Sequence, residues 1–312
     1  MQACGRKVSK NKLIVITGPT ASGKSALAVD VAARLGTEVI SADSRQIYKG
    51  IPIVTAVPSE EERRGVRHHL LEVLPLDSYY SASEFERDAL GILDSLFSRA
   101  GIAVVCGGSM MYVDALCNGI DEIPTVPEEI RRGLMAEWDE RGDDWLLSEL
   151  RHIDPRHYEK VDRKNMKRVF HAVEVSLTAG CPYSSLLTGM RRERPFDIVK
   201  ICLAGSRDAL FERINRRVEM MVSSGLEEEA RSVSHLRHLN SLNTVGLKEM
   251  FMYFDGALSR EEAVARIQKN TRVYAKKQIT WHKRDESMVR LDFTDSVPVN
   301  AERILNISEI IS

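Results

Sequence analysis

The strongest constraint on the fold is a loop of eight residues near the start of the chain. The loop consists of Gly18, Pro19, Thr20, Ala21, Ser22, Gly23, Lys24 and Ser25. An apolar run at 13–17 precedes it, and a helix-like segment at 26–35 follows it. A strand, a glycine loop and a helix in this order gather backbone N–H groups and the positive helix end around one point, which binds a di- or triphosphate. Lys24 adds a cation and the Ser25 hydroxyl can bind Mg²⁺, so we expect a phosphorylated ligand.

Strand-like and helix-like segments alternate in the first part of the chain. Apolar runs at 13–17, 38–42 and 102–106 are separated by helix-like segments such as 82–99. This alternation predicts an α/β fold, a P-loop NTPase-like parallel sheet with helices on both faces. A later apolar run at 198–203 is interpreted as a further strand of that sheet.

The pattern changes after residue 119, where long charged helix-like segments replace the alternation. We predict a mostly helical insertion domain at 120–195, inserted into an α/β core formed by 1–119 and 196–312. Amphipathic helices are expected within the second part of this core, at 207–224, 226–239 and 260–283.

The charge distribution is more informative than the formal net charge of −1. Acids outnumber bases in residues 121–150, whereas bases outnumber acids in 160–217 and 260–290. Such an asymmetry is compatible with a basic face for a polyanion and equally with ordinary charged helix surfaces.

Cysteine usage and hydropathy indicate a cytoplasmic protein. The five cysteines show neither CxxC pairs nor an even count, so we expect reduced thiols and no zinc site; they are Cys4, Cys106, Cys117, Cys181 and Cys202. Apolar runs are only strand-sized, so neither a membrane span nor a signal peptide is expected.

Asp43 follows the second predicted strand. In an open parallel sheet the ligand crevice lies beyond the carboxyl ends of the strands, so this carboxylate is expected to face the bound phosphates. Its position allows three roles: Mg²⁺ ligand, general base towards an acceptor, or N-cap of the next helix.

The third predicted strand ends in Gly107, Gly108 and Ser109. A typical nucleotide hydrolase has an Mg²⁺-binding acid at the end of such a strand. The glycines instead allow close approach of backbone or ligand, which weakens the ATPase interpretation without excluding a small-molecule kinase.

Two arginines, Arg213 and Arg217, are four residues apart on one face of a predicted helix. They are compatible with a bidentate clamp on a leaving pyrophosphate, or with salt bridges to Glu212 and Glu219 within the helix. Met220, three residues after Arg217, is interpreted as a core side chain; the alternative is that it lines an apolar pocket.

Together these segments resemble one family, the tRNA dimethylallyltransferases, also called tRNA isopentenylpyrophosphate transferases. The resemblance extends over residues 13–292 and rests on separated motifs in a fixed order. The motifs are 18–25 (GPTASGKS), 43–48 (DSRQIY), 68–71 (HHLL), 80–82 (YSA), 107–112 (GGSMMY), 164–168 (KNMKR), 172–175 (AVEV), 212–218 (ERINRRV), 243–249 (NTVGLKE) and 274–281 (YAKKQITW).

The resemblance implies transfer of a dimethylallyl group from dimethylallyl pyrophosphate to the exocyclic N6 amine of an adenosine. That adenosine lies 3′ of the anticodon in tRNAs reading codons that begin with U. The phosphate loop would therefore hold a prenyl diphosphate rather than ATP. Mg²⁺ as cofactor, the tRNA anticodon stem-loop as partner and a monomeric state follow from the same resemblance.

The resemblance also assigns roles to residues. Asp43 would deprotonate the adenine amine, Ser109 would lie beside the diphosphate and the base, and Lys24 and Arg217 would stabilise the departing pyrophosphate. The residues that it matches to tRNA-contacting positions are Asp43, Ser44, Arg45, Gln46, Ser109, Arg131, Lys164, Asn165, Met166, Lys167, Arg168, Asn243, Thr244, Val245, Gly246, Leu247 and Lys248.

Several positions depart from the family pattern. Residues 54–58 read VTAVP where GTAKP is usual, which removes a cation. His171 replaces a common arginine, Leu247 a common tyrosine and His282 a common phenylalanine, whereas Arg45 occupies a variable position. None of these changes removes a group that the resemblance assigns to the chemistry.

Three other functions compete with prenyl transfer to tRNA. A P-loop kinase would bind and turn over ATP. A prenyltransferase acting on a free adenine nucleotide would have no use for the basic cluster at 164–168. A non-catalytic RNA-binding protein would not require Asp43, Lys24 and Arg217.

Overall fold

The computed structural model describes residues 11–310, so Cys4 lies outside the described part of the chain. One six-stranded sheet has the order β3-β2-β4-β1-β5-β6, with every neighbouring pair parallel. The strands are β1 Lys12–Thr17, β2 Val39–Ser41, β3 His68–His69, β4 Ile102–Cys106, β5 Asp197–Ala204 and β6 Val289–Asp292. The predicted α/β fold with a parallel sheet is confirmed.

The described part of the chain forms two compact units. The first comprises residues 11–118 and 193–310, and the second comprises Gly119–Arg192. The helices of the first unit are α1 Lys24–Leu35, α2 Pro52–Thr55, α3 Glu60–Arg63, α4 Ala82–Ala100, α5 Met110–Asn118, α10 Arg207–Ser223, α11 Leu226–Val233, α12 Leu247–Phe254, α13 Arg260–His282 and α14 Val297–Ile310, with short 3₁₀ turns at Ser234–Leu236 and Asn240–Leu242.

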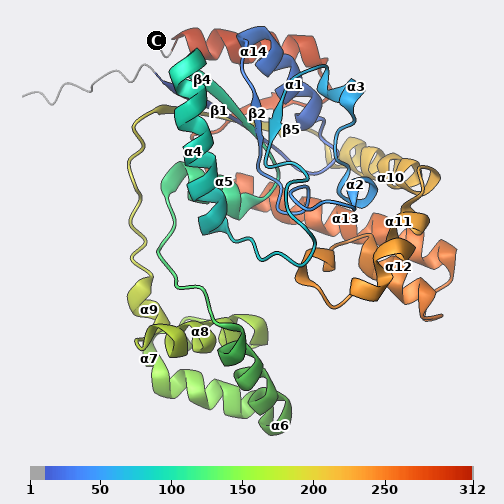
Figure 1. The fold of residues 1–312 in the computed structure, drawn as a ribbon. Helices are drawn as coiled ribbons and strands as arrows, with labels where there is room; N and C mark the ends of the chain where they lie inside the picture. The colour runs from blue at the N-terminus through green and yellow to red at the C-terminus, as the bar shows by residue number, and fades with distance from the viewer. Residues whose placement is uncertain (1–10, 311–312) are drawn as a thin grey trace, which may run out of the picture. The chain divides into compact units, whose positions relative to one another are not determined.

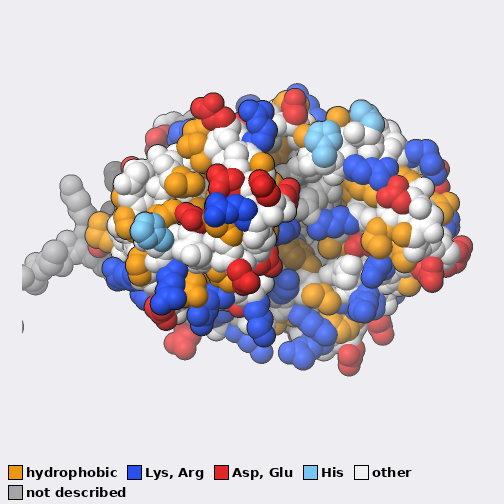
Figure 2. Space-filling model, turned by 90° about the horizontal axis from the view of Figure 1, so that it is seen from below, with side chains coloured by type: hydrophobic (Ala, Val, Ile, Leu, Met, Phe, Trp, Pro, Cys, Tyr) orange, Lys and Arg blue, Asp and Glu red, His pale blue; other side chains and the backbone are white. Residues whose placement is uncertain are grey.

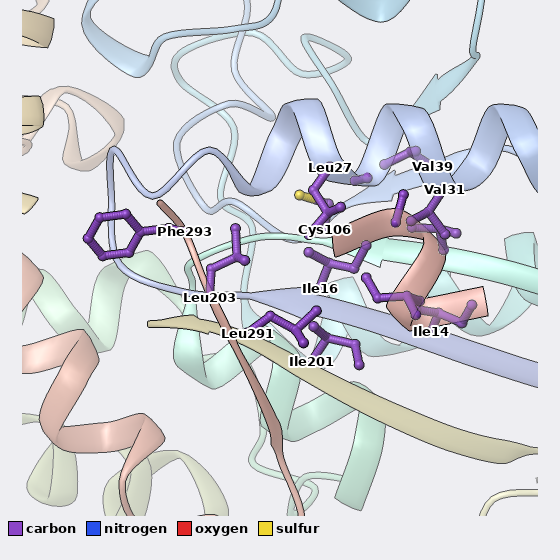
Figure 3. Close-up of a cluster of buried hydrophobic side chains, with 14 of the residues drawn as sticks. Ile14, Ile16, Leu27, Val31, Val39, Cys106, Ile201, Leu203, Leu291 and Phe293 are labelled. Atoms are coloured by element: carbon purple, nitrogen blue, oxygen red, sulfur yellow. The ribbon is translucent and has the colours of Figure 1, made fainter. Parts of the chain in front are cut away.

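Helices cover both faces of the sheet (Figure 1). On one face, Ile14 and Ile16 of β1 pack with Leu27 and Val31 of α1 (Figure 3). Because side chains alternate along a strand, Leu13 and Val15, which are also fully buried, point to the other face, where α4 and α5 lie. A strand buried on both faces explains the continuous apolar run of the sequence.

The strand order creates a crevice at one edge of the sheet. From β1 the chain crosses to β2, two positions away, and from β4 it later crosses past β1 to β5. Loops that leave neighbouring strands in opposite directions open a gap at the carboxyl ends of those strands. The loops after β1, β2 and β4, which carry the predicted site residues, all begin at that edge.

The second unit is helical. Its helices are α6 Glu128–Ile153, α7 Pro155–Tyr158, α8 Met166–Ala179 and α9 Tyr183–Leu186. Gly142, with φ 79° and ψ −177°, interrupts α6 and divides it into two helical segments. Both segments contribute to one small core, in which Leu134 and Leu150 pack with Val173 of α8.

The structure differs from the sequence-based segments mainly where elements are short. The strand β3 has two residues and β6 has four, too few to give a readable hydrophobic period. The predicted helix 226–239 ends at Val233 and continues as a 3₁₀ turn. Among residues 11–310, no helix combines the length and the apolar character needed to cross a bilayer.

Candidate functional site

The phosphate loop (residues 18–25) connects β1 to α1. Gly18 has φ 154° and Gly23 has φ 89°, in the left-handed range that favours glycine. At Gly18 a side chain would also lie 3.0 Å from the Leu203 carbonyl oxygen. Gly23 is the N-cap of α1, and no side chain caps that helix end, so its first N–H groups remain available to an anion.

Two cations face the phosphate loop. Lys24 Nζ lies 3.4 Å from the Pro19 carbonyl oxygen, and Arg217 Nη1 lies 3.2 Å from Thr20 Oγ1. Burial lowers the pKa of Lys24, and the neighbouring charge of Arg217 lowers it further. Burial also lowers the pKa of Arg217, against the opposing effect of Asp43. Two partly buried positive charges this close favour a bound polyanion, which would stabilise both.

Arg213, one helical turn before Arg217, also reaches the loop. Its Nη1 lies 3.5 Å from the Ser22 carbonyl oxygen, and its guanidinium stacks 4.8 Å from the ring centre of Phe293. Within residues 11–310 neither arginine forms an ion pair with Glu212 or Glu219. The sequence is compatible with a clamp on pyrophosphate and with salt bridges inside the helix. In the structure both arginines contact the phosphate loop, which supports the clamp.

Asp43 lies in the turn after β2 and uses one carboxylate oxygen to hold that turn. Oδ1 accepts hydrogen bonds from the N–H groups of Arg45 (2.9 Å) and Gln46 (3.4 Å). The described residues offer no hydrogen bond to Oδ2. Because Asp43 also lines the cavity next to the phosphate loop, the capping role and a role towards a ligand are compatible in one side chain.

Ser109 is bound tightly to the same turn. The Ser44 N–H donates to Ser109 Oγ at 2.7 Å, and Ser109 Oγ lies 3.1 Å from Ser44 Oγ. The preceding glycines permit this contact, since a side chain at Gly107 would lie 2.0 Å from the Ala42 carbonyl oxygen and one at Gly108 would lie 2.5 Å from Gln278 Nε2. The predicted close approach at these glycines is therefore made by the protein itself.

Three cavities meet around these residues. The first, of about 70 Å³, is lined by Lys24, Ser25, Asp43 and Arg217. The second, of about 320 Å³, shares Asp43 and Arg217 and extends to residues 243–245 and Lys248. The third, of about 680 Å³, shares Lys24 and Arg217 with the first.

The third cavity also has an apolar side. Ile53, Val57, Met220 and Met221 line it. Met220 was interpreted as a core side chain, with a pocket lining as the alternative, and it is 55% exposed. The pocket lining is therefore the correct alternative for this residue.

The residues present suit a magnesium ion that takes most of its ligands from a substrate. The residues described include no cluster of three or more His, Cys, Asp or Glu side chains able to hold a metal. Ser25, in the first turn of α1, lines the cavity together with Asp43. Mg²⁺ commonly binds one or two protein oxygens and completes its shell with phosphate oxygens and water, so the Ser25 hydroxyl can serve as its protein ligand.

Two of the core residues predicted to contact tRNA, Arg45 and Gln46, also support neighbouring loops. Arg45 donates to the carbonyl oxygens of Asn240 (2.8 Å), Ser241 (3.1 Å) and Asn243 (3.4 Å). Gln46 Nε2 donates to the carbonyl oxygens of Thr55 and Ala56.

Residues 243–248 divide between surface and core. The side chains of Asn243 and Lys248 are exposed, and those of Thr244 and Val245 are half-buried. At Gly246, φ is 105° and a side chain would lie 2.4 Å from Val54 Cγ2. The side chain of Leu247 has no exposed surface, because helix α12 begins at Leu247 and turns it into the core; the tRNA contact predicted at this residue stays a prediction.

The helical unit presents basic side chains at the start of α8. Lys164, Lys167 and Arg168 are exposed, while Asn165 caps the helix through the N–H of Arg168. Met166 packs against the core of this unit. Figure 2 shows Lys and Arg side chains over much of the face seen from below, with Asp and Glu among them.

Arg131 is engaged within the helical unit. Its Nε and Nη2 lie 2.9 Å and 3.0 Å from the two carboxylate oxygens of Glu174. Burial alone would raise the pKa of Glu174, but hydrogen bonds from His171 and Arg131 lower it. This bidentate pair ties α6 to α8, so Arg131 has a structural contact beside the predicted contact with tRNA.

Sequence reasoning assigned no role to Gln278 and Tyr274, which both line the first cavity from α13. Burial, followed by the charge of Asp43, raises the pKa of Tyr274 to about 12, so its hydroxyl stays protonated. Both residues belong to the motif at 274–281. Their four-residue spacing was the available signal, since it places them on one helix face.

Comparison with known proteins identifies the family. The family model described as IPP transferase matches residues 46–285. A tRNA dimethylallyltransferase 2 of Parabacteroides distasonis is 51% identical over 88% of this chain and 92% of the relative. The tRNA dimethylallyltransferase of Christiangramia forsetii is 42% identical over 92% of this chain and 95% of the relative.

Solved structures agree with these relatives. The full-length tRNA isopentenylpyrophosphate transferase of Bacillus halodurans superimposes with a TM-score of 0.71 at 33% identity, covering 96% of each chain. A eukaryotic dimethylallyltransferase acting on tRNA gives a TM-score of 0.78 at 26% identity, over 91% of this chain and 74% of the other. With a family model over most of its length and a relative identical at about half of the aligned positions, this chain belongs to the IPP transferase family.

Proposed function

We propose that this chain transfers a dimethylallyl group from dimethylallyl pyrophosphate to the N6 amine of the adenosine 3′ of the anticodon in tRNAs that read U-starting codons. Pyrophosphate is the second product. The observation that carries the proposal is the meeting of an anion-binding loop, two cations and one carboxylate at a single cavity. The family membership of the chain supports the same reaction.

The diphosphate binds to the phosphate loop. The N–H groups at the N-terminus of α1, which no side chain caps, bind it, and Lys24 and Arg217 pair with its oxygens. The lowered pKa values of both cations support this assignment, because a polyanion replaces the water that burial removes. The apolar third cavity, which shares both cations, accommodates the five-carbon group.

The Ser25 hydroxyl, in the first turn of α1, would hold a Mg²⁺ bound together with the diphosphate. When bound, the ion neutralises charge on the departing diphosphate.

The chemical step forms one bond and breaks one. The adenine N6 attacks C1 of the allyl group as the bond from C1 to the diphosphate oxygen breaks, and the electron pair of that bond leaves with pyrophosphate. Lys24 and Arg217 stabilise this developing charge. An adenine amine is a weak nucleophile, so Oδ2 of Asp43 accepts the N6 proton as the new bond forms. Ser109, fixed to the turn at Ser44, positions the base beside this carboxylate.

The adenine enters through the second cavity, which shares Asp43 with the first. Its outer wall includes Asn243 and Lys248, and both are exposed to an RNA loop. The base is stacked in a free anticodon loop, so it must be extruded to reach Asp43. Exposed Lys164, Lys167 and Arg168 of the helical unit bind tRNA phosphates, which fixes the RNA without reading its sequence.

One chain supplies all of these groups, so we propose that it acts as a monomer in the cytoplasm, where its tRNA substrates are found. The direct test is incubation with dimethylallyl pyrophosphate, Mg²⁺ and unmodified tRNA, followed by mass analysis of the nucleosides. The expected product is N6-dimethylallyladenosine at the position 3′ of the anticodon. Unmodified nucleosides with intact protein would contradict the proposal.

Matched reactions separate the alternatives. Replacing the prenyl donor with ATP tests the kinase, which would consume ATP. Replacing tRNA with free AMP tests the enzyme that acts on nucleotides, which would prenylate AMP. Binding of tRNA with no product under any condition would leave a non-catalytic RNA-binding protein.

A further inference from the structure

Helix α13 presents two buried polar side chains to the site, Gln278 and His282. They are four residues apart and therefore lie on the same helix face, and each is only 2% exposed. Burying an amide and an imidazole is unfavourable unless both are hydrogen-bonded, so their partners indicate why they are there.

The Gln278 amide joins two loops with its two ends. Oε1 accepts from the N–H of Thr20 at 2.8 Å, and Nε2 donates to the carbonyl oxygen of Gly108 at 2.9 Å. One loop offers a donor and the other an acceptor, and an amide is the side chain that satisfies both at once. Thr20 also accepts a hydrogen bond from Arg217, so this contact reaches the proposed diphosphate site directly.

His282 makes a second connection one helical turn away. Its Nε2 lies 2.9 Å from Thr17 Oγ1, and that hydroxyl donates to the Gly107 carbonyl oxygen at 3.0 Å. The threonine hydroxyl has one hydrogen and uses it on the carbonyl, so Nε2 must donate to Thr17. The connection thus links the last residue of β1, the end of β4 and α13.

These contacts lie where the sheet ends. The β1–β4 pairing ends at Ile16 and Cys106. Beyond it, residues 18–25 carry the diphosphate site and residues 107–109 carry Ser109. We propose that Gln278, with His282 behind it, is a positioning residue that sets the spacing between the phosphate loop and Ser109. The inference rests on the proposed function, since that spacing decides how the departing diphosphate faces the attacking amine.

Two substitutions of Gln278 divide its contacts. Gln278→Met keeps the length of the side chain and removes both hydrogen bonds. Gln278→Glu keeps an acceptor for the Thr20 N–H and removes the donor to Gly108. The added negative charge can only weaken anion binding, so any diphosphate affinity that Gln278→Glu retains over Gln278→Met must come from the Thr20 contact.

The expected results follow from this division. Gln278→Met raises the KM for dimethylallyl pyrophosphate and lowers kcat, by about 100-fold together, as expected for a misplacement of about 1 Å. Gln278→Glu lowers kcat similarly with a smaller change in KM. The Kd for tRNA stays within about threefold of the wild type in both variants, because the exposed basic residues are unchanged. Thr280→Ala, an exposed substitution on the same helix, is the control and should retain wild-type kinetics.

The thermal midpoint of each variant shows whether it is folded. Folded Gln278→Met with wild-type kcat and KM would overturn the proposal. So would an equal loss of prenyl transfer, diphosphate binding and tRNA binding, which would indicate a general structural role. Inorganic pyrophosphate binding by calorimetry separates this inference from the proposed function: if the wild type binds pyrophosphate but transfers no prenyl group, the proposed function fails, while weaker binding by Gln278→Met still supports the loop contact.

Discussion

Replacement of Asp43 by asparagine separates the two roles that the structure gives to this residue. Oδ1 holds the turn by accepting from the N–H groups of Arg45 and Gln46, whereas Oδ2 has no partner within residues 11–310. Asparagine keeps an acceptor oxygen for the turn and replaces the other oxygen with an amide that cannot take a proton. Asp43→Asn should therefore leave the loop intact and remove only the proposed base.

The magnitude follows from the kind of catalysis. A positioned general base contributes a factor of about 10² to 10⁴, so kcat for Asp43→Asn should fall by about that factor, with the KM for dimethylallyl pyrophosphate nearly unchanged. Single-turnover formation of N6-dimethylallyladenosine in tRNA, with enzyme in excess, measures the chemical step directly.

Asp43→Ala is the matched comparison. It removes the base and also leaves the two turn N–H groups without their acceptor, a loss of about 0.5–2 kcal/mol for a comparable cap. In a protein of this size we expect a thermal midpoint lower by several degrees, at about 2–4 °C for each kcal/mol. The two variants should thus be equally slow but differ in stability. Asp43→Asn that works within about threefold of the wild-type rate would refute the assignment of Asp43 as the base.

Three further predictions concern the cations and the buried histidine. Arg217→Gln should lower kcat by about 10²–10³ and weaken pyrophosphate binding; an unchanged rate would remove Arg217 from the diphosphate site. Replacing Lys167 and Arg168 by alanine should weaken tRNA binding and reduce the slope of log Kd against the logarithm of the salt concentration by about one to two. A change confined to diphosphate affinity would contradict the tRNA assignment. Burial, with Lys24 and Arg290 adding to it, lowers the pKa of His282 from 6.5 to about 4, so the unfolded chain binds a proton first as the pH falls. Stability that is complete above pH 6.5 should decline by about 3 kcal/mol towards pH 4, and urea unfolding of His282→Phe should show a decline smaller by that amount.

The phosphate loop and the main segments could be predicted because their signals are local. Gly23 is needed by its own backbone angle, and the strand before it is buried on both faces, which leaves a continuous apolar run. Helix starts were also readable where a serine caps them, as Ser81 does for α4 and Ser259 for α13. The short strands β3 and β6 lack such signals, and their pairing with longer neighbours defines them.

The site itself depends on contacts between residues far apart in the sequence. Arg217 reaches Thr20 across 197 positions, and Gln278 reaches it across 258. No periodicity carries that information, which is why the sequence left two interpretations of the arginine pair and gave no role to Gln278. The i, i+4 spacing shows which residues share one face of a helix. The order of the strands in the sheet decides which loops that helix face contacts.

Arg45 has a structural contact that the resemblance alone does not indicate. The resemblance matches Arg45 to a tRNA-contacting position. In the structure, however, its guanidinium donates to three backbone carbonyl oxygens of residues 240–243. Asn240 and Ser241 lie in a 3₁₀ turn and Asn243 follows it, and a guanidinium has enough N–H groups to reach all three carbonyl oxygens. Arg45 therefore holds the loop at residues 240–243, which carries the exposed Asn243. An effect of Arg45 on tRNA binding should act through the conformation of this loop.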